Sequence, residues 1–264
     1  MIHREYGSTG VRCSILGFGG MRFPRELAAD DCAALVKAAY DGGITYFDTA
    51  IGYGRSEEVM GLAFKEMLKS RARRPFTVAT KTFAATPDDV RRDAETSLKR
   101  LQVDAIDFYH MWCVLSPQAY HKRKLSAALK GFEKLKAEGL VRHIVVSTHM
   151  DGADIAEMLR DYPFEGVLLG YSAMNFAYRE AALEAAARGG RGVVVMNPLG
   201  GGIIPQHPER FAFVKSRPDE TVVEGALRFL FNDPRITTTL VGFSSRPQLD
   251  EALRKALCGH GLVG

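Results

Sequence analysis

Short apolar runs alternate along the chain with longer stretches in which apolar residues recur at helical spacing. The short runs are rich in β-branched and aromatic residues, as strands usually are. They predict eight strands, at residues 13–19, 44–48, 76–81, 106–110, 142–148, 166–170, 192–197 and 237–242. Spacings near i, i+3 and i+4 predict eight intervening helices, at residues 27–41, 56–69, 87–101, 125–138, 152–160, 178–188, 221–231 and 246–257.

Polar residues and glycines at the ends of these stretches support the helices. Thr86 stands directly before Pro87, as an N-cap residue does before a proline at the first helical position. Ser245 and Gln248 have the spacing of a capping box. Residues 198–220 form the longest stretch without a regular pattern, and a loop of that length usually carries function or a short extra helix.

The alternation of strands and helices predicts a parallel sheet, because parallel neighbours need crossover helices. Eight units in 264 residues fit a closed (β/α)₈ TIM barrel that spans residues 1–264 as one domain. A doubly wound open sheet is the alternative. It is disfavoured because "GFGGM", at the end of the first strand, lacks the G-x-G-x-x-G spacing.

Composition and charge narrow the class of protein. With 46% hydrophobic and 25% charged residues, the chain has ordinary globular composition. The net charge is +4, and the basic and acidic residues are interspersed along the chain, so we expect no nucleic-acid partner. No apolar run approaches the roughly 18 residues of a membrane span, and the polar start has no signal-peptide pattern. The four cysteines share no C-x-x-C spacing, and a reducing cytoplasm is the expected compartment. The oligomeric state stays open.

Chemically active side chains stand at the ends of three successive predicted strands. Asp48 ends the second strand, with Tyr53 in the loop that follows, and Lys81 and His110 end the third and fourth strands. Each residue alone has an ordinary explanation as a cap or a surface residue. Because active sites of TIM barrels lie at the C-terminal ends of the strands, we expect the four side chains to share one rim.

These four residues form a proton-donating group. An unperturbed phenol has a pKa near 10, so Tyr53 would need a pKa lower by about 2–3 to work near neutrality. An ammonium about 4 Å away stabilises the phenolate by on the order of 4 kcal/mol at an effective dielectric near 20. A single lysine can therefore lower the pKa by this amount. Asp48 can keep Lys81 charged, and His110 can orient a carbonyl oxygen. A metal site is disfavoured, because only His110 and Asp48 are conventional ligands.

A proton donor alone reduces nothing, so a hydride source is required. The stretch "NPLGGG" (197–202) offers backbone that a ligand can approach closely. The stretch "GFSSRPQ" (242–248) leads into a helix whose N-terminus favours phosphate. The loops after strands seven and eight are the usual phosphate site of such barrels. The alternative is a good helix cap and a flexible glycine loop without a ligand.

Several motifs together resemble the aldo-keto reductase family. They are "GITYFDTAIGYGRSEEVMG" (43–61), "ATK" (79–81), "IDFYHMW" (106–112), "VVST" (145–148), "NPLGGG" (197–202) and "VGFSSRPQLDEA" (241–252). The resemblance implies a (β/α)₈ barrel that reduces aldehydes or ketones with NAD(P)H. It implies Tyr53 as the general acid, Lys81 as the residue that lowers its pKa and Asp48 as the partner of Lys81. It also implies that His110 orients the carbonyl of a small-molecule substrate.

The resemblance also implies a cofactor site, with NADP(H) favoured over NAD(H). Its residues are Ser147, Thr148, Met196, Asn197, Pro198, Leu199, Gly200, Gly202, Gly242, Ser244, Arg246, Gln248 and Glu251. Gly242 and Gln248 stand where many members have the lysine and arginine that bind the 2′-phosphate, and Ala252 stands in place of an asparagine; Ser244, Ser245 and Arg246 are the candidate substitutes. Three positions at the nicotinamide also differ from the family pattern. Thr148 replaces an asparagine, Leu168 replaces a glutamine, and Met196 replaces an aromatic residue that stacks on the nicotinamide. A thioether can still pack on a ring.

Within the family, the sequence most resembles a branch whose members often carry an iron–sulfur extension. The chain ends at "CGHGLVG" without a cysteine cluster, so we expect no cluster. Two other functions remain open. The altered nicotinamide positions favour a regulatory barrel that senses the cofactor with low turnover. A lyase or aldolase that uses Lys81 as a Schiff base needs a neutral amine, which Asp48 disfavours.

Overall fold

The computed structural model describes residues 1–69 and 74–257, and its central feature is a closed barrel of eight parallel strands. These are β3 (Leu16–Gly19), β4 (Tyr46–Asp48), β5 (Thr77–Thr82), β6 (Ile106–Val114), β7 (Val141–Thr148), β8 (Gly166–Gly170), β9 (Gly192–Met196) and β10 (Thr238–Val241). Each strand pairs with the next, and β10 closes on β3 with Thr239 opposite Leu16. The predicted TIM barrel is confirmed, and the open sheet is excluded.

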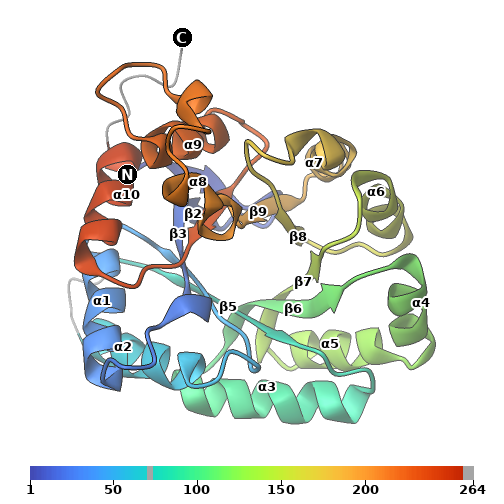
Figure 1. Cartoon of the computed structure of the whole chain (residues 1–264). Helices are drawn as coiled ribbons and strands as arrows, with labels where there is room; N and C mark the ends of the chain where they lie inside the picture. The colour runs from blue at the N-terminus through green and yellow to red at the C-terminus, as the bar shows by residue number, and fades with distance from the viewer. Residues whose placement is uncertain (70–73, 258–264) are drawn as a thin grey trace.

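Helices surround the barrel as an outer ring (Figure 1). They are α1 (Ala29–Asp41), α2 (Ser56–Lys69), α3 (Pro87–Leu101), α4 (Pro117–Leu125), α5 (Ala128–Ala137), α6 (Gly152–Asp161), α7 (Glu180–Arg188), α9 (Val222–Phe231) and α10 (Arg246–Leu257). The helix predicted at 125–138 is α5 alone, because Ala127 adopts a left-handed φ of 62° and separates it from α4. The sequence did not predict α4, whose buried residue is Tyr120.

The N-terminal segment forms a hairpin that the sequence did not predict. Strand β1 (His3–Glu5) pairs antiparallel with β2 (Arg12–Ser14), so the strand expected at 13–19 is wrong as one element. Tyr6, between these strands, is fully buried, and its ring stacks on Phe108 with centroids 4.0 Å apart. A Cβ at the first residue of β8 or β9 would collide with the Tyr6 ring, so glycines there make room for it. Tyr6 therefore fills the N-terminal end of the barrel.

The long segment after β9 contains short helices, as its length predicted. They are η3 (Gly200–Gly202), α8 (Ile203–Gln206) and η4 (Ala212–Val214). Two further 3₁₀ turns follow β3 and β8, η1 (Gly20–Arg22) and η2 (Phe176–Tyr178). In Figure 1, α8 lies in front of the barrel strands, between α9 and β9. None of the described helices is long and apolar enough to cross a membrane.

Alternate residues of the strands fill the barrel interior. One buried cluster contains Tyr46, Ala79, Phe108, Val145, Leu168, Val194 and Leu240, one from each of seven strands. Because strand side chains alternate between the two faces, residues two positions further along point to the same interior. At the C-terminal ends these are Asp48, Lys81, His110, Ser147, Gly170, Met196 and Gly242. The predicted residues Asp48, Lys81 and His110 thus lie together in the ring at the barrel mouth.

Candidate active site

A buried ion pair forms the base of the site. Lys81 Nζ donates to Asp48 Oδ1 at 2.5 Å and to the backbone carbonyl of Thr49 at 2.6 Å. The side chains of Lys81 and Asp48 are 1% and 5% exposed. Burial raises the pKa of Asp48, and the charge of Lys81 offsets only part of that rise. Since an unpaired charge at this depth would cost several kcal/mol, each partner holds the other in place.

Tyr53 lies beside this ion pair, in the loop that follows β4. Lys81 Nζ is 4.9 Å from the centre of the Tyr53 ring. The loop is ordered by its own backbone, with Tyr53 N–H donating to the Ala50 carbonyl at 3.0 Å and Ser56 N–H to the Tyr53 carbonyl at 3.1 Å. The predicted proximity of Tyr53 and Lys81 is therefore present in the fold.

The direction of the Tyr53 pKa differs from the sequence prediction. Burial raises the pKa of the phenol above its usual value, and the nearby Lys81 ammonium lowers it by less. The net rise contradicts the expected fall, because desolvation of the phenol outweighs the attraction of an ammonium already paired with Asp48. A phenol with a raised pKa stays protonated through the neutral range. At neutral pH Tyr53 therefore carries its proton.

His110 completes the group on β6. It is fully buried, and neither of its ring nitrogens has a hydrogen-bond partner among the described residues. Burial lowers the pKa of His110 well below its usual value, and the positive charge of Lys81 lowers it further. The imidazole is thus neutral, with one N–H donor and one free acceptor. The backbone of Val146 contacts the ring and raises the pKa of His110 by less, and buried polar atoms that lack a full hydrogen bond are rare in folded proteins.

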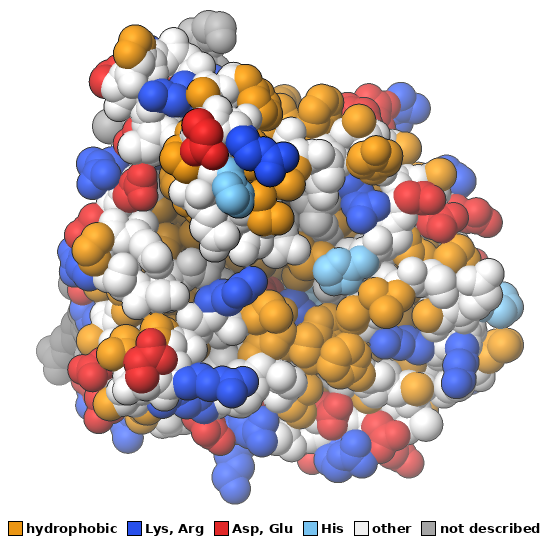
Figure 2. Space-filling model, viewed as in Figure 1, with side chains coloured by type: hydrophobic (Ala, Val, Ile, Leu, Met, Phe, Trp, Pro, Cys, Tyr) orange, Lys and Arg blue, Asp and Glu red, His pale blue; other side chains and the backbone are white. Residues whose placement is uncertain are grey.

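Two features of the mouth were not predicted as functional. Gly170 is buried, yet a Cβ on it would meet no atom within 4 Å, so there is open space inside the mouth at the end of β8. Phe83 and Trp112 stack with centroids 3.8 Å apart, and Trp112 meets the Tyr53 ring edge-on at 5.2 Å. Figure 2 shows hydrophobic side chains gathered over the ends of β5 and β6. In the sequence, the apolar residues around Trp112 were the signal that could have identified this aromatic pair.

The predicted nicotinamide contacts occupy different environments. Ser147 lies in the inward ring, and no hydrogen bond joins its hydroxyl to another described residue. The hydroxyl of Thr148 donates to the Val114 carbonyl at 2.8 Å and accepts from Met150 N–H at 3.1 Å, so it serves the local backbone. Leu168 is buried in the interior cluster, and Met196 packs against that cluster. Ser147 is therefore the predicted polar residue that remains available here.

The loop after β9 brings backbone toward the mouth. Asn197 is exposed and adopts a left-handed φ of 55°, Pro198 is buried, and Leu199 is partly buried. The next three glycines, Gly200, Gly201 and Gly202, have φ of 62°, 71° and 104°. A Cβ at Gly200 would collide with Met174 Sδ. Glycine is favoured at all three positions because it adopts positive φ without strain.

The start of α10 carries polar groups at the same end of the barrel. Ser244 N–H donates to Gln248 Oε1 at 2.9 Å, so the expected capping-box bond forms one residue before Ser245. Arg246 pairs with Asp250 at 2.7 Å on the exposed face. Arg22, which sequence reasoning missed, lies beside Gly242, since a Cβ there would be 3.1 Å from Arg22 Cβ. Two arginines therefore flank the N-terminus of α10.

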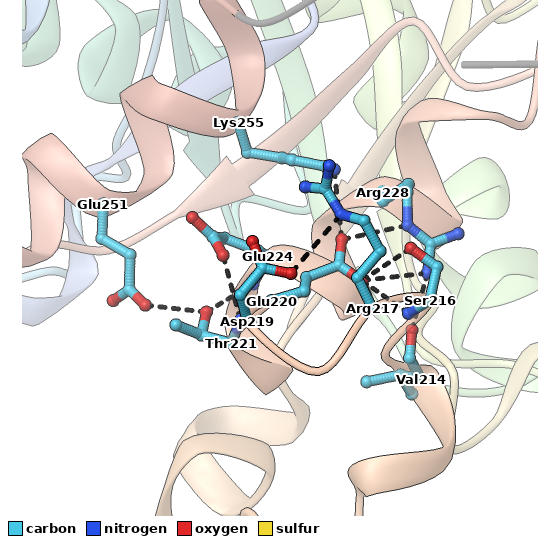
Figure 3. A network of polar contacts seen from close by, with 10 residues as sticks. All are labelled: Val214, Ser216, Arg217, Asp219, Glu220, Thr221, Glu224, Arg228, Glu251 and Lys255. Carbon is cyan, nitrogen blue, oxygen red and sulfur yellow. Dashed lines mark hydrogen bonds and ion pairs between the residues drawn. The ribbon is translucent and has the colours of Figure 1, made fainter. Parts of the chain in front are cut away.

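Glu251 lies in a different network. It accepts a hydrogen bond from the Thr221 hydroxyl at 2.9 Å, at the N-cap of α9 (Figure 3). This contact links α10 to α9. Within residues 1–69 and 74–257, no three His, Cys, Asp or Glu side chains are grouped as metal ligands would be. Cys258, on which the iron–sulfur expectation depended, lies outside the described residues.

The chain has relatives among known proteins. The profile of the Aldo/keto reductase family matches residues 15–257. The chain belongs to the aldo/keto reductase family of oxidoreductases. It is 29% identical over 280 residues to L-galactose dehydrogenase from Arabidopsis thaliana, covering 94% of this chain and 86% of that protein. It is 25% identical over 243 residues to D-threo-aldose 1-dehydrogenase from a Pseudomonas species, covering 77% and 71%.

A solved structure shares the fold of this aldo/keto reductase. An aldo-keto reductase from Bacillus halodurans, solved in its holo form, superposes with a TM-score of 0.81 at 22% identity. The superposition covers 97% of this chain and 90% of the other. At 22% identity, the likeness shows that the two proteins share the barrel fold. The chemistry of this family member must therefore be argued from its own site.

Proposed function

We propose that the protein reduces the carbonyl group of an aldehyde or ketone with NAD(P)H, with Tyr53 as the general acid. The observation that carries the proposal is the buried Lys81–Asp48 pair beside the Tyr53 ring. His110, buried and without partners, supplies a donor in the same ring of residues. Family membership supports the same reaction class.

The residues present fit a nicotinamide cofactor. The open space at Gly170 leaves room for a flat ring beside the inward-pointing Ser147. The glycine turn at 200–202 offers backbone groups, and the N-terminus of α10 with Arg22 and Arg246 suits phosphates. These two arginines favour NADP(H), which carries the additional phosphate. When bound, the cofactor supplies the hydride that adds to the carbonyl carbon.

The protein groups then act on the carbonyl oxygen. Neutral His110 donates its N–H and fixes the orientation of the oxygen. Tyr53 O–H donates the proton that becomes the hydroxyl hydrogen of the product. The charge of Lys81 stabilises the phenolate left on Tyr53, and Asp48 keeps that ammonium in position. The burial of Lys81 and Asp48 strengthens their interaction, since water screens it less.

The proposal includes two further assignments, the cellular compartment and the branch of the family. Cys13, Cys32 and Cys113 form no disulfide, which supports a reducing compartment such as the cytoplasm. The resemblance of the sequence supports a place near the branch whose members often carry an iron–sulfur extension.

A second candidate is a cofactor-sensing barrel with low turnover. It is favoured by the environments of two residues. Leu168 is apolar and lies in the interior cluster, and the Thr148 hydroxyl is hydrogen-bonded to the backbone. Both positions lose the amide partner that the family pattern provides, which would weaken the hold on the nicotinamide.

Titration of the purified protein with NADPH and with NADH, followed by a panel of aldehydes, quinones and keto sugars, separates the two candidates. We expect tighter binding of NADPH and its oxidation by at least one carbonyl compound. Saturable cofactor binding with no oxidation across the panel would favour the sensor. Absence of binding of either cofactor would contradict both.

A further inference from the structure

The barrel interior beneath the buried ion pair contains hydroxyl groups that the proposed mechanism does not use. Tyr46 lies two residues before Asp48 on β4, so both side chains point into the barrel. Thr238 on β10 borders the same space, and Tyr6 enters it from the N-terminal end, where its ring stacks on Phe108. Branched aliphatic side chains usually fill the interior of such barrels, so these three hydroxyls need an explanation.

The three hydroxyls are buried, and each lacks a full hydrogen bond. Tyr6, Tyr46 and Thr238 are all 0% exposed, and their oxygens have no hydrogen-bond partner among the described residues. The same holds for Oδ2 of Asp48, although its Oδ1 accepts from Lys81. Buried polar atoms are almost always paired with protein groups or with ordered water. Four such atoms in one barrel therefore need a partner.

Contacts between the side chains place these atoms in one part of the interior. A Cβ on Gly17 would be 3.0 Å from Thr238 Oγ1 and 3.4 Å from Cδ1 of Tyr46, so the threonine hydroxyl borders that ring. The rings of Tyr6 and Tyr46 are stacked with their centroids 6.2 Å apart. Burial is the main cause of the raised pKa of both phenols, and the carboxylate of Asp48 raises each pKa further. Both phenols are therefore neutral donors close to a carboxylate.

We propose that ordered water in this part of the interior joins the Tyr46 hydroxyl to Asp48 Oδ2. The hydroxyls of Tyr6 and Thr238 complete the hydrogen bonds of that water. Water suits the place because it donates to a carboxylate while it accepts from a neutral phenol. Donors directed at a carboxylate favour its ionised form, which opposes the burial of Asp48. Tyr46 is thus a positioning residue, which keeps Asp48 ionised and thereby keeps Lys81 charged beside the general acid of the proposed function, on which this role rests.

Asp48 is the group whose ionisation reports on the water. The titratable side chains around it are Lys81 from β5, Tyr53 from the loop after β4, His110 from β6, and Tyr46 and Tyr6 from the interior. Lys81 is the cation among them, and the phenols and the imidazole are neutral near pH 7. Removal of one interior hydroxyl therefore changes the titration of Asp48 through hydrogen bonding and leaves the charges around it unchanged.

The stability of Tyr46→Phe distinguishes a bridged hydroxyl from an orphaned one. Removal of an orphaned buried hydroxyl relieves its desolvation cost and raises the midpoint of urea denaturation, whereas removal of a bridged hydroxyl loses hydrogen bonds and lowers it. We expect a lower midpoint than that of wild type for Tyr46→Phe and for the equally conservative Thr238→Val. A higher midpoint for Tyr46→Phe would overturn the proposal.

The titration of Asp48 tests the same water without any turnover. The full chain is labelled with ¹³C at its aspartate carboxyl groups, and Asp48→Asn identifies the resonance by its loss. We expect the titration midpoint of Asp48 to rise by about one pH unit in Tyr46→Phe, as the loss of a hydrogen bond to a charged group predicts.

Tyr109→Phe is the matched control for both measurements. Tyr109 is also a fully buried tyrosine, but its hydroxyl donates to the Val90 carbonyl of α3 at 3.4 Å, outside the barrel interior. This variant should lower the urea midpoint and leave the titration of Asp48 unchanged. Equal Asp48 midpoints in wild type and Tyr46→Phe would contradict the proposal, even in a protein that reduces carbonyl compounds. A raised midpoint in a protein that never oxidises NADPH would support the interior water and count against the reductase function, so the two failures are distinguishable.

Discussion

Burial sets the charge state of the side chains around the mouth. It raises the pKa of Asp48 and of Tyr53, and it lowers that of His110. All three shifts favour the neutral form, because desolvation penalises the charged one. The ammonium of Lys81 is stabilised by Asp48 and by a backbone carbonyl. The site thus combines the buried Lys81–Asp48 pair with two neutral hydrogen-bond donors, Tyr53 and His110, which suits protonation of an oxygen.

A flat pH profile follows from these charge states. Below its raised pKa Tyr53 keeps its proton, and above its lowered pKa His110 stays neutral. We therefore expect kcat/KM for carbonyl reduction to change little between about pH 6 and pH 8. Steady-state kinetics across this range, in wild type and in His110→Gln, provide the measurement. An inflection near pH 6.5 that disappears in His110→Gln would contradict the depressed pKa of His110.

At the scale of elements, close approach between helices positions the Tyr53 loop. Helix α2 follows that loop and packs on α3, and Gly61 lies at this contact. A Cβ on Gly61 would collide with the carbonyl of Arg100 at the end of α3. On the barrel side, Thr80 of β5 donates to buried Glu57 at 2.7 Å. The start of α2 is therefore tied to the strand that carries Lys81.

Gly61→Ala should separate α2 from α3. The collision is with backbone, which cannot rotate away, so we expect a loss of about 1–3 kcal/mol in the free energy of unfolding. Urea denaturation measures this loss, with Lys65→Ala on the exposed face of α2 as control, expected within about 0.5 kcal/mol of wild type. Equal stability of Gly61→Ala and Lys65→Ala would refute the role of this contact.

Much of this element-level organisation could be predicted from the sequence. The barrel was predictable because the burial of the strands and of one face of each helix leaves a periodic pattern of apolar residues. The rim position of Asp48, Lys81 and His110 follows because each stands at the C-terminal end of a predicted strand. The hairpin at Tyr6 was missed because its strands are short and mixed in polarity. The raised pKa of Tyr53 and the bulge of β6 at Cys113, where its pairing with β7 shifts, depend on packing depth and register, which have no local signature in the chain.

At the scale of the whole molecule, Glu220 joins the segment after β9 to the last two helices. Its buried carboxylate accepts from Arg228 at 3.1 Å, from Lys255 at 3.1 Å and from Ser216 N–H at 2.7 Å, as Figure 3 shows. Burial raises its pKa, but these partners outweigh burial and hold the pKa at about 2. The network therefore ties the end of the segment after β9 to α9 and to the C-terminal part of α10.

The depressed pKa of Glu220 predicts how acid affects stability. A carboxyl whose pKa is lower in the folded state stabilises the fold above its unfolded pKa and loses that contribution as the pH falls. The shift from 4.5 to about 2 corresponds to on the order of 3 kcal/mol. We expect Glu220→Gln to lose about this much at pH 7 and to depend less on pH between 4.5 and 2.

Chemical denaturation at several pH values tests this prediction. Glu26→Gln, at an exposed position, is the control and should follow wild type. A pH dependence of Glu220→Gln identical to that of wild type would show that the network carries no such linkage.

The central claim is that Tyr53 donates the proton to the carbonyl oxygen, and the turnover of Tyr53→Phe tests it most directly. The exposed Tyr178→Phe serves as control. With NADPH and a carbonyl substrate of wild type, we expect kcat of Tyr53→Phe to fall by at least about 100-fold, while NADPH affinity and the activity of Tyr178→Phe are unchanged. A Tyr53→Phe protein that turns over at the wild-type rate would contradict the account.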